Sequence, residues 1–510
     1  MPFEISISWF LLASLVAGSI YWLWGKTKRS YTKFKVPPFP VQPWPFVGHF
    51  FLLFGDLRDI LEDWKKKAGD IYSLDIVGQH HVVFNDFKDG KEVWVKHADH
   101  IVNVQHSFGD EVLDEYNTGI SSARDENWKE QRSISISILR SFGMGKNIMA
   151  EKIMEEVAVI NERLASFKGE PREVGLLINS CVSNVISSVA VGKRFDIDDN
   201  DFKNLIRRVN IFIKYFGIMQ VLTPFKLVTR LPRDFFHAKT WSKATLEINE
   251  EYSKPFLRKY QQEFNENEEP QNFISAYLKE MKRKNDNNLP SNLDEKNLLV
   301  IVRSLFAAGS DTTSTTILWC LVYMLYYPKI QEKVYREIEA NVGTERLPNI
   351  SDKPKLTYLN AVISETQRFA SIAPIALRRE VSKAIEVRGY TIPKGSVIWL
   401  ALDSVHYDKR IWGDPEKFRP ERFIDGNGAL INREELIPFG IGRRLCMGEA
   451  LAKMELFMFL SAMFQRFRFE PEDESGKLPS LKAVIGTTAV PQPFKMRFID
   501  RKHVTSSSNQ

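Results

Sequence analysis

The sequence predicts a mainly α-helical protein with small β-sheets, preceded by one membrane-spanning helix. Between about residue 56 and residue 460, most long stretches carry apolar residues at the spacing of an amphipathic helix. Two shorter stretches alternate apolar and polar residues, as β-hairpins do. Residues 5–24 form twenty positions without a charge. At a rise of ~1.5 Å per residue this run reaches ~30 Å, the thickness of the hydrocarbon core of a bilayer.

The charges on either side of the apolar run predict its orientation in the membrane. Glu4 precedes the run, and a group of cations without an intervening acid follows it. These cations are Lys26, Lys28, Arg29, Lys33 and Lys35. Because a cleaved signal peptide carries its positive charge before the apolar run, we predict that residues 1–25 are a retained anchor. The rest of the chain is then cytosolic. The alternative, a buried N-terminal core helix, does not explain cations on one side only.

A basic and proline-rich hinge is predicted at residues 26–45. Five prolines fall within residues 37–45, and proline stiffens the chain toward the polyproline II conformation. The hinge is therefore expected to act as a semi-rigid spacer. Residues 46–500 then form the main folded domain, and residues 501–510 form a flexible tail.

Within the folded domain, the spacing of apolar residues predicts the elements in order. Helices are predicted at 57–68, 128–143 and 152–167, and hairpin strands at 71–86 and 384–402. The stretch 261–297 is dense in Glu, Asn and Lys, which predicts a surface helix with loops.

The longest predicted helix covers residues 294–327, with Asn292 or Asp294 as its N-terminal cap. Its middle, residues 307–313, contains a glycine, threonines and Asp311, which are unfavourable inside a buried helix. One explanation is a solvated bend. The other is a kink over a cofactor, with a carboxylate and a hydroxyl supplied for proton movement.

The composition excludes several classes of protein. Seventy Lys and Arg against 64 Asp and Glu give a net charge of +6 over 510 residues, which is too dilute for a nucleic-acid binder. The three cysteines, Cys181, Cys320 and Cys446, lie 139 and 126 positions apart. This spacing argues against a disulfide scaffold, a zinc ribbon and an iron–sulfur cluster. A metal site with one cysteine remains open.

Cys446 is the strongest candidate for such a site. Gly440 and Gly442 precede it and permit a tight turn, and Gly448 opens the next predicted helix. A cysteine at a helix N-terminus favours the thiolate, and Arg444 can bind a carboxylate bidentately. A thiolate without a second cysteine, beside an arginine suited to a propionate, fits axial ligation of haem iron. The alternative is that Cys446 is an inert buried side chain.

Five short motifs occur in a fixed order along the chain. They are WxxxR at Trp128 and Arg132, AGxDT at Ala308, Gly309, Asp311 and Thr312, ExxR at Glu365 and Arg368, PERF at 420–423, and FxxGxRxCxG at Phe439, Gly442, Arg444, Cys446 and Gly448. In these motifs the chain resembles the cytochrome P-450 family, the haem-thiolate monooxygenases. The anchor and the hinge resemble its microsomal branch, and the stretch 128–155 resembles the animal subfamilies that handle drugs, steroids and fatty acids.

The resemblance implies the cytochrome P-450 fold, an α-rich triangular prism with haem b between the long central helix and the helix after Cys446. Cys446 is then the axial ligand of the haem iron, and Asp311 and Thr312 organise protons. The other implied haem contacts are Trp128, Arg132, Ala308, Arg379, Phe439, Arg444 and Gly448, with Arg378 as the alternative to Arg379. The implied structural network behind the haem is Glu365, Arg368 and Arg422. The alternative for that network is a surface ion pair, which contributes only ~0–1 kcal/mol.

The implied activity is insertion of one oxygen atom of O2 into a small apolar or amphipathic substrate. A xenobiotic, a steroid and a fatty acid are not distinguished by the sequence. The pocket would draw on 101–118, 205–216, 303–312, 372–377 and 484–488, including Phe108, Phe212, Ala307 and Ile375. The run 222–236 is apolar and basic, which predicts either a second membrane contact or a core-facing loop.

The implied partners follow from what the chain lacks. It has no convincing dinucleotide-binding GxGxxG after a strand, so electrons from NADPH would arrive through NADPH–cytochrome P-450 reductase, with a microsomal b-type cytochrome as a second donor. The implied location is the endoplasmic reticulum membrane, and no nucleic-acid partner is expected. Two alternatives remain, a reductase-independent haem-thiolate isomerase and a non-catalytic membrane haem protein. Retention of Asp311 and Thr312 argues against both.

Overall fold

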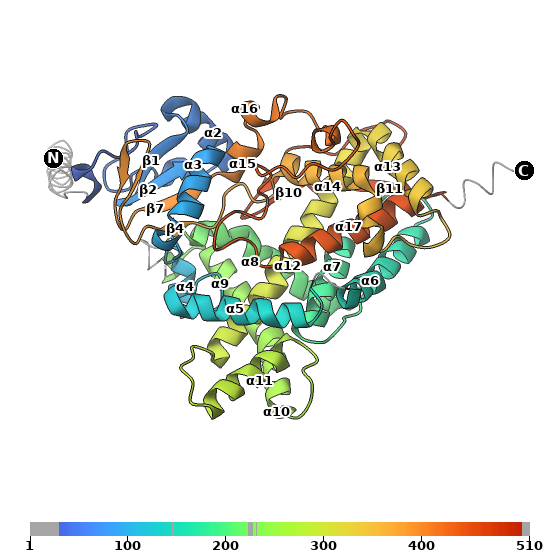
Figure 1. The fold of residues 1–510 in the computed structure, drawn as a ribbon, viewed down its shortest axis with the longest axis horizontal. Coiled ribbons are helices and arrows are strands. Elements are labelled where there is room, and N and C mark those ends of the chain that lie inside the picture. The colour runs from blue at the N-terminus through green and yellow to red at the C-terminus, as the bar shows by residue number, and fades with distance from the viewer. Residues whose placement is uncertain (1–29, 145–146, 223–227, 231, 502–510) are drawn as a thin grey trace, which may run out of the picture. The chain divides into compact units, whose positions relative to one another are not determined.

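The computed structural model describes residues 30–501, except residues 145–146, 223–227 and 231 (Figure 1). The predicted anchor at 1–25, the start of the hinge and the tail from 502 onward lie outside the described residues, as do parts of the run 222–236. In the described part of the chain, no helix is both long enough and apolar enough to cross a bilayer. The chain forms two compact units. Unit 1 contains residues up to 105 and residues 375–404, and unit 2 contains residues 106–374 and those from 405 onward.

Unit 1 is built around a four-stranded sheet with the strand order β1-β2-β7-β4. The predicted hairpin at 71–86 is present as β1 (Ile71–Ile76) and β2 (Gln79–Phe84). The prediction of hairpin strands across 384–402 is wrong for β7 (Val397–Leu400), which pairs in parallel with β2. β7 consists of four buried residues in succession, a pattern typical of a parallel strand that is covered on both faces.

The other elements of unit 1 are short. They are η1 (Ser30–Lys33), η2 (Phe50–Leu53), α2 (Leu57–Ala68), α3 (Phe87–Lys91), η3 (Glu92–Lys96), η4 (Ala98–His100), β4 (Arg379–Glu380), β5 (Ile385–Val387) and β6 (Tyr390–Ile392). The described part of the hinge lies against the sheet. The Ser73 N–H donates to Pro38 O at 2.9 Å, and the Tyr31 hydroxyl donates to Asp75 Oδ2 at 2.5 Å. These bonds hold this stretch on unit 1, which the proline pattern alone did not predict.

Unit 2 is mainly helical, in agreement with the predicted fold class. Its helices are α4 (Phe108–Val112), α5 (Asp125–Ser141), α6 (Asn147–Ser166), α7 (Gly175–Ala190), α8 (Asn200–Met219), α9 (Ala238–Ile248), α10 (Lys254–Gln262), α11 (Phe273–Asp286), α12 (Glu295–Tyr326), α13 (Pro328–Asn341), α14 (Thr357–Ala370), α16 (Lys409–Trp412) and α17 (Glu449–Arg466). Shorter turns are η5 (Val228–Arg230), η6 (Phe235–His237), η7 (Asn249–Ser253), η8 (Ile350–Lys355) and η9 (Pro420–Phe423), and α15 (Leu402–His406) spans the boundary between the units in sequence.

The strands of unit 2 form two small sheets. They are β3 (Arg172–Glu173), β8 (Phe467–Pro471), β9 (Val484–Ile485), β10 (Ala489–Val490) and β11 (Lys495–Asp500). β11 lies between β3 and β8 in one antiparallel sheet, and β9 and β10 form a separate hairpin. Small sheets beside long helices are what the sequence pattern predicted.

The long helix α12 agrees closely with the predicted range. Asp294 is its cap, since the Asp294 carboxylate accepts from the Asn297 N–H at 2.6 Å. The predicted kink is not seen, because residues 307–313 keep α-helical backbone. The glycine at position 309 is explained by packing. A Cβ there would lie 3.2 Å from Ile186 Cγ1, so Gly309 lets α7 approach α12 closely.

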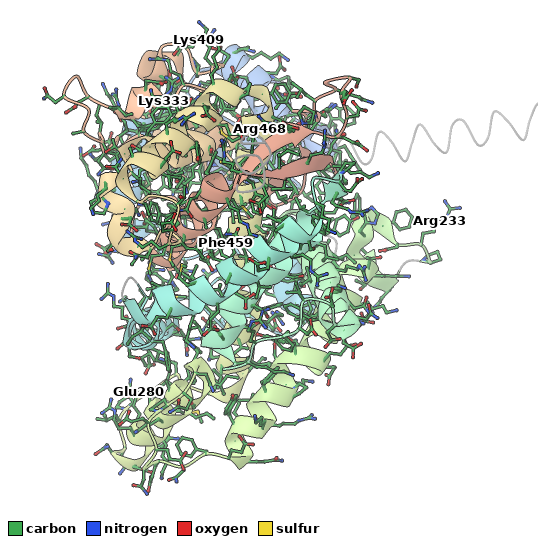
Figure 2. All side chains as sticks on the ribbon, turned by 90° about the vertical axis from the view of Figure 1, so that its right-hand side faces the viewer. Arg233, Glu280, Lys333, Lys409, Phe459 and Arg468 are labelled. Atoms are coloured by element: carbon green, nitrogen blue, oxygen red, sulfur yellow. The ribbon has the colours of Figure 1, made fainter. Side chains whose placement is uncertain are left out.

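α17 packs directly against α12 in the core of unit 2 (Figure 1). Phe459 of α17 is buried, whereas Lys333 of α13 and Arg468 of β8 are exposed; all three are labelled in Figure 2. The two helices also share a buried polar contact, in which the Thr313 hydroxyl donates to Glu455 Oε2 at 3.1 Å. Burial raises the pKa of Glu455 to about 8, although the Thr313 hydrogen bond lowers it. Glu455 is therefore mostly protonated at neutral pH.

A buried ion network joins α14 to the segment that follows α16. The Glu365 carboxylate accepts from Arg368 Nε and Nη2, both at 2.8 Å, and from Arg422 Nε at 3.1 Å. The side chains of Glu365 and Arg368 are 0% exposed, so the surface-pair alternative does not hold. The remaining N–H groups of both arginines donate to backbone carbonyls of residues 406–417. The network thus satisfies a stretch of chain that has little regular structure.

Replacing Arg368 with alanine is expected to lower the free energy of unfolding by roughly 3–5 kcal/mol, because the Glu365 carboxylate then stays buried with one cation fewer. Arg283→Ala is the matched control. Arg283 and Glu280, which is labelled in Figure 2, have the same i, i+3 spacing and two N–O distances of 2.7 Å, but they lie at the surface. There the expected loss is ~0–1 kcal/mol. Chemical denaturation of both variants measures the difference, and equal losses would contradict it.

Glu455→Gln is expected to stabilise the protein at alkaline pH. The folded state holds a proton that the unfolded chain releases between the ordinary pKa of 4.5 and about 8. The stability contributed by protonated Glu455 is therefore complete below the lower value and is lost as the pH rises through the higher one. Thermal unfolding at about pH 9 should give a higher midpoint for the variant than for the wild type, with the difference shrinking toward pH 5. The exposed Glu151→Gln serves as the control. A difference that does not depend on pH would rule out this assignment.

Candidate functional site

The loop that carries Cys446 precedes α17 and is shaped by two glycines. Gly440 and Gly442 have φ angles of 77° and 79°, in the left-handed region that favours glycine. The Cys446 N–H donates to Phe439 O at 3.0 Å, and the Leu445 N–H donates to Gly442 O at 3.0 Å. The tight turn predicted from the sequence is therefore present, and it fixes the backbone that leads to the thiol.

The buried ion network holds this loop from behind through His406. The carbonyl of His406 accepts from Arg368 Nη1 at 2.8 Å, while its ring Nε2 accepts from the Ile437 N–H at 3.1 Å. The other ring nitrogen pairs with Ser371 Oγ at 3.1 Å. Burial, followed by the nearby charge of Arg368, lowers the pKa of His406 to about 3, so the ring stays neutral and Nε2 remains an acceptor. The start of the Cys446 loop is thus tied to the buried ion network of unit 2.

The Cys446 side chain is accessible, yet protein surrounds it closely. Burial raises the pKa of the Cys446 thiol, and the negative charge of Glu449 adds to this. The N–H groups of Gly448 and Glu449 and the cation of Arg132 lower it. The predicted effect of the helix N-terminus is therefore present, but burial outweighs it in the chain alone. A bound metal ion would supply the positive charge that a thiolate needs here.

Two side chains of α5, Trp128 and Arg132, meet Arg444 of the Cys446 loop. The guanidinium carbon of Arg444 lies 4.4 Å from the centre of the Trp128 ring, and that of Arg132 lies 5.9 Å from it. Arg132 Nη2 donates to Leu445 O at 2.7 Å, which ties α5 to the loop. The buried Nε1 of Trp128 has no hydrogen-bond partner among the described residues. The cluster therefore presents two cations and an unused donor.

Arg444 makes bonds that the sequence did not predict. Its Nη1 donates to the carbonyls of Ile120 and Ser121 at 3.1 and 3.3 Å, and its Nη2 donates to Ala123 O at 2.5 Å. The sequence assigned these donors to a carboxylate. In the structure they fix the loop before α5, and the positive charge of Arg444 lies over Trp128. Arg444 thus organises the cluster as well as charging it.

The middle of α12 has the accessibility expected beside a cofactor. Ala308 is exposed although the helix is buried before and after it, so no described side chain covers this point. Thr312, one turn later, is half-buried, and its Oγ1 donates to Ala308 O at 2.8 Å. Asp311 is buried, which excludes the solvated bend. Burial raises the pKa of Asp311 to about 6, and a hydrogen bond from the Thr488 hydroxyl, at 2.9 Å, lowers it.

The predicted pocket residues divide between the two units. Phe108, Phe212 and Ala307 are buried in unit 2. The Phe212 ring stacks on Trp241 with 5.7 Å between centroids, and a Cβ on Gly109 would lie 2.7 Å from the same indole. Phe212 and the residue that follows Phe108 therefore both face the Trp241 indole.

Three predicted site residues, Ile375, Arg378 and Arg379, belong to unit 1. Arg379 lies in β4 opposite Ile398 of β7. Arg378, the alternative to Arg379, holds its guanidinium carbon 4.7 Å from the Trp399 ring. Burial lowers the pKa of Arg378 to about 10. Their predicted contacts with haem and substrate stay predictions.

The sequence did not predict the polar contacts of Arg303 and Thr488, which lie in predicted pocket segments, or those of Glu455. Arg303 of α12 is buried; its Nη1 donates to Glu115 Oε1 at 2.7 Å and to Asn249 Oδ1 at 2.9 Å, and its Nη2 also bonds Glu115. A lone arginine in the apolar run LLVIVRSLFAA was the available signal. Thr488 and Glu455 gave none, because their partners on α12 lie 177 and 142 positions away.

The donor set fits haem. A haem needs an accessible thiolate for its iron, a small side chain beside its face, and donors for two carboxylates. Cys446, Ala308 and the cluster of Trp128, Arg132 and Arg444 have these properties. A Cβ on Gly448 would meet no protein atom within 4 Å, so packing within the protein does not explain that glycine.

Comparisons with known proteins identify the family of the chain. The cytochrome P450 family model matches residues 37–498. The chain is 40% identical over 373 residues to cytochrome P450 2U1 of Homo sapiens, which covers 72% of this chain and 67% of that protein. It is 35% identical to cytochrome P450 2J5 of Mus musculus over 91% of both chains. It is 32% identical to cytochrome P450 2B19 of Mus musculus over 98% of this chain and 100% of that one. The chain therefore belongs to the cytochrome P450 family, and it is a haem-thiolate monooxygenase.

Proposed function

We propose that the protein inserts one oxygen atom of O2 into a small apolar or amphipathic molecule, with electrons supplied from NADPH by a separate flavoprotein reductase. The observation that carries this proposal is the pair of Asp311 and Thr312 beside the exposed Ala308 on α12. A buried acid next to a hydroxyl is suited to proton delivery, which a peroxide-rearranging isomerase does not need. Xenobiotics, steroids and fatty acids are the proposed substrates.

The haem, when bound, supplies the redox chemistry that activates O2. Cys446 would hold its iron, with the N–H groups of Gly448 and Glu449 stabilising negative charge on the sulfur. Trp128 Nε1 and the guanidinium groups of Arg132 and Arg444 would bind its carboxylates. The small side chain of Ala308 would leave room for the group, and the Phe439 carbonyl accepts from the Cys446 N–H.

Thr312 and Asp311 have complementary roles in moving protons. The Thr312 hydroxyl donates to Ala308 O in the structure, and rotation about χ1 would redirect its proton toward the exposed side of α12. Asp311, with a pKa of about 6, exchanges protons readily near neutral pH. We propose that Asp311 takes protons from solvent and that Thr312 holds the last donor at its Oγ1.

The buried charges near Phe212 neutralise each other, which leaves an apolar surface for the substrate. The guanidinium of Arg303 lies 5.7 Å from the Phe212 ring, but the Glu115 carboxylate neutralises it. Phe108, Phe212 and Ala307 then present only apolar surface. A small molecule that is mostly hydrocarbon, with a polar group at one end, matches this composition.

We also propose that the protein is anchored in the endoplasmic reticulum membrane by residues 1–25. Five large aromatic side chains in the described stretch that follows are exposed, namely Phe34, Trp44, Phe46, Phe51 and Phe54. Exposed aromatic residues next to an apolar segment suit the interfacial layer of a bilayer. The membrane position also brings the protein to its proposed partners, NADPH–cytochrome P-450 reductase and a microsomal b-type cytochrome.

Reconstitution with the reductase tests the proposed function. With NADPH, isotopically labelled O2 and a panel of apolar and amphipathic compounds, we expect NADPH consumption that depends on substrate, and product with one labelled oxygen. Cys446→Ser is the control, because a serine oxygen cannot give the same soft ligation. The variant should lose both the product and the carbon monoxide absorption that names the family. Product formed without NADPH would instead support an isomerase, and no turnover of any compound would support a non-catalytic haem protein.

Thr312→Ala is expected to uncouple the enzyme without unfolding it. The change removes one oxygen and one methyl group, which typically costs ~1 kcal/mol, so haem content should be retained. Without the hydroxyl, hydrogen peroxide released per NADPH should rise and product should fall. Thr316→Ala is the matched control, since Thr316 makes the same bond to Thr312 O at 2.9 Å one turn further along. If both variants keep the wild-type peroxide yield, Thr312 has no part in proton delivery.

A further inference from the structure

We propose that Thr488 is a positioning residue for Asp311, and that the turn which carries it fixes the Asp311 carboxyl relative to α8 and α12. This inference rests on the proposed role of Asp311 in proton delivery. It concerns a residue that lies in the segment 484–488, which the sequence predicted only as a lining of the substrate pocket.

The bond between the two residues is buried and short. Thr488 Oγ1 donates to Asp311 Oδ2 at 2.9 Å, and the two residues are 7% and 6% exposed. Solvent therefore competes little for either partner. A hydroxyl donor at this place favours the ionised form of Asp311 and opposes the effect of burial on its pKa. It also selects which carboxyl oxygen remains available for other partners.

The turn between β9 and β10 is held from several sides, so Thr488 has a fixed position. The Gly217 N–H at the end of α8 donates to Thr487 Oγ1 at 2.8 Å. A Cβ on Gly486 would lie 2.9 Å from Lys214 O, so the turn touches the α8 backbone itself. On the other side, Ala489 O accepts from Trp319 Nε1 of α12 at 2.8 Å, and the Ala489 N–H donates to Ile372 O at 2.8 Å.

The charged groups of the neighbouring elements are engaged elsewhere. On α12, Arg303 is paired with Glu115, and on α17, Glu455 bonds Thr313. On α8, the Lys214 ammonium lies 5.3 Å from the Tyr215 ring. Burial and the Thr488 hydroxyl are the two effects that set the pKa of Asp311 among the described residues. Loss of the hydroxyl should therefore act on Asp311 without a compensating charge.

Thr488→Val and Thr488→Ser test the proposal on the haem-loaded protein. Valine has nearly the same shape but cannot donate, whereas serine keeps the hydroxyl. Infrared titration of the carboxyl band that Asp311→Asn lacks should give a midpoint near pH 6 in the wild type. We expect this midpoint to rise by about one pH unit in Thr488→Val and to stay in place in Thr488→Ser. The pH profile of peroxide released per NADPH should move by the same amount.

Thr487→Val is the matched control, since it removes a neighbouring hydroxyl of the same turn while the bonds of Ala489 remain. Its midpoint should equal that of the wild type. If Thr488→Val does not load haem, Thr488→Ala is compared with Thr488→Ser in its place. Equal midpoints in Thr488→Val and wild type would overturn the positioning role of Thr488 alone. Wild-type coupling in Asp311→Asn would overturn the proposed role of Asp311 itself.

Discussion

The buried carboxylate of Glu365 is the interaction on which the rest of unit 2 depends. It pairs with both Arg368 and Arg422, while the Asp414 carboxylate lies 3.2 Å from Arg422 Nη2, and the two arginines in turn satisfy the carbonyls of a long irregular segment. His406 extends the network to the Cys446 loop by accepting from the Ile437 N–H. A thiol that must meet a metal at a fixed place needs a stiff support, and a buried, fully bonded ion network provides one without regular secondary structure.

The second requirement of the site is space, and small or polar residues inside the core create it. Ala308 leaves one point of α12 uncovered. The next residue, Gly309, instead allows close packing, because it lets α7 approach the helix. Asp311 is buried one turn after Ala307, which is costly unless the carboxyl is hydrogen-bonded or protonated. The Thr488 hydroxyl donates one hydrogen bond to this carboxyl, and the pKa of Asp311 is about 6. A carboxyl with this pKa is suited to exchanging protons near neutral pH.

Much of the fold was predictable because its signals are short-range. Apolar periodicity places α2 at the predicted residues and α12 within one residue of them at each end. The prediction failed where pairing between distant segments decides. β7 was predicted to pair within a local hairpin, but its four buried residues pair in parallel with β2, which is distant in sequence. The bonds from Arg444 to the carbonyls of Ile120, Ser121 and Ala123 likewise join segments more than 320 positions apart, whereas its contact with a carboxylate stays a prediction.

The sequence by itself determined which residues are the candidates for the site: a lone cysteine after two glycines, an acid beside a threonine inside a helix, and a glutamate three residues before an arginine. These patterns act through local backbone conformation and helical spacing, so a few neighbouring residues suffice to define them. Only the tertiary structure decided the partners of those residues. Thr488 meets Asp311 across 177 positions, and Thr313 meets Glu455 across 142. Such contacts depend on how whole helices pack, and packing leaves no pattern in the sequence around either partner.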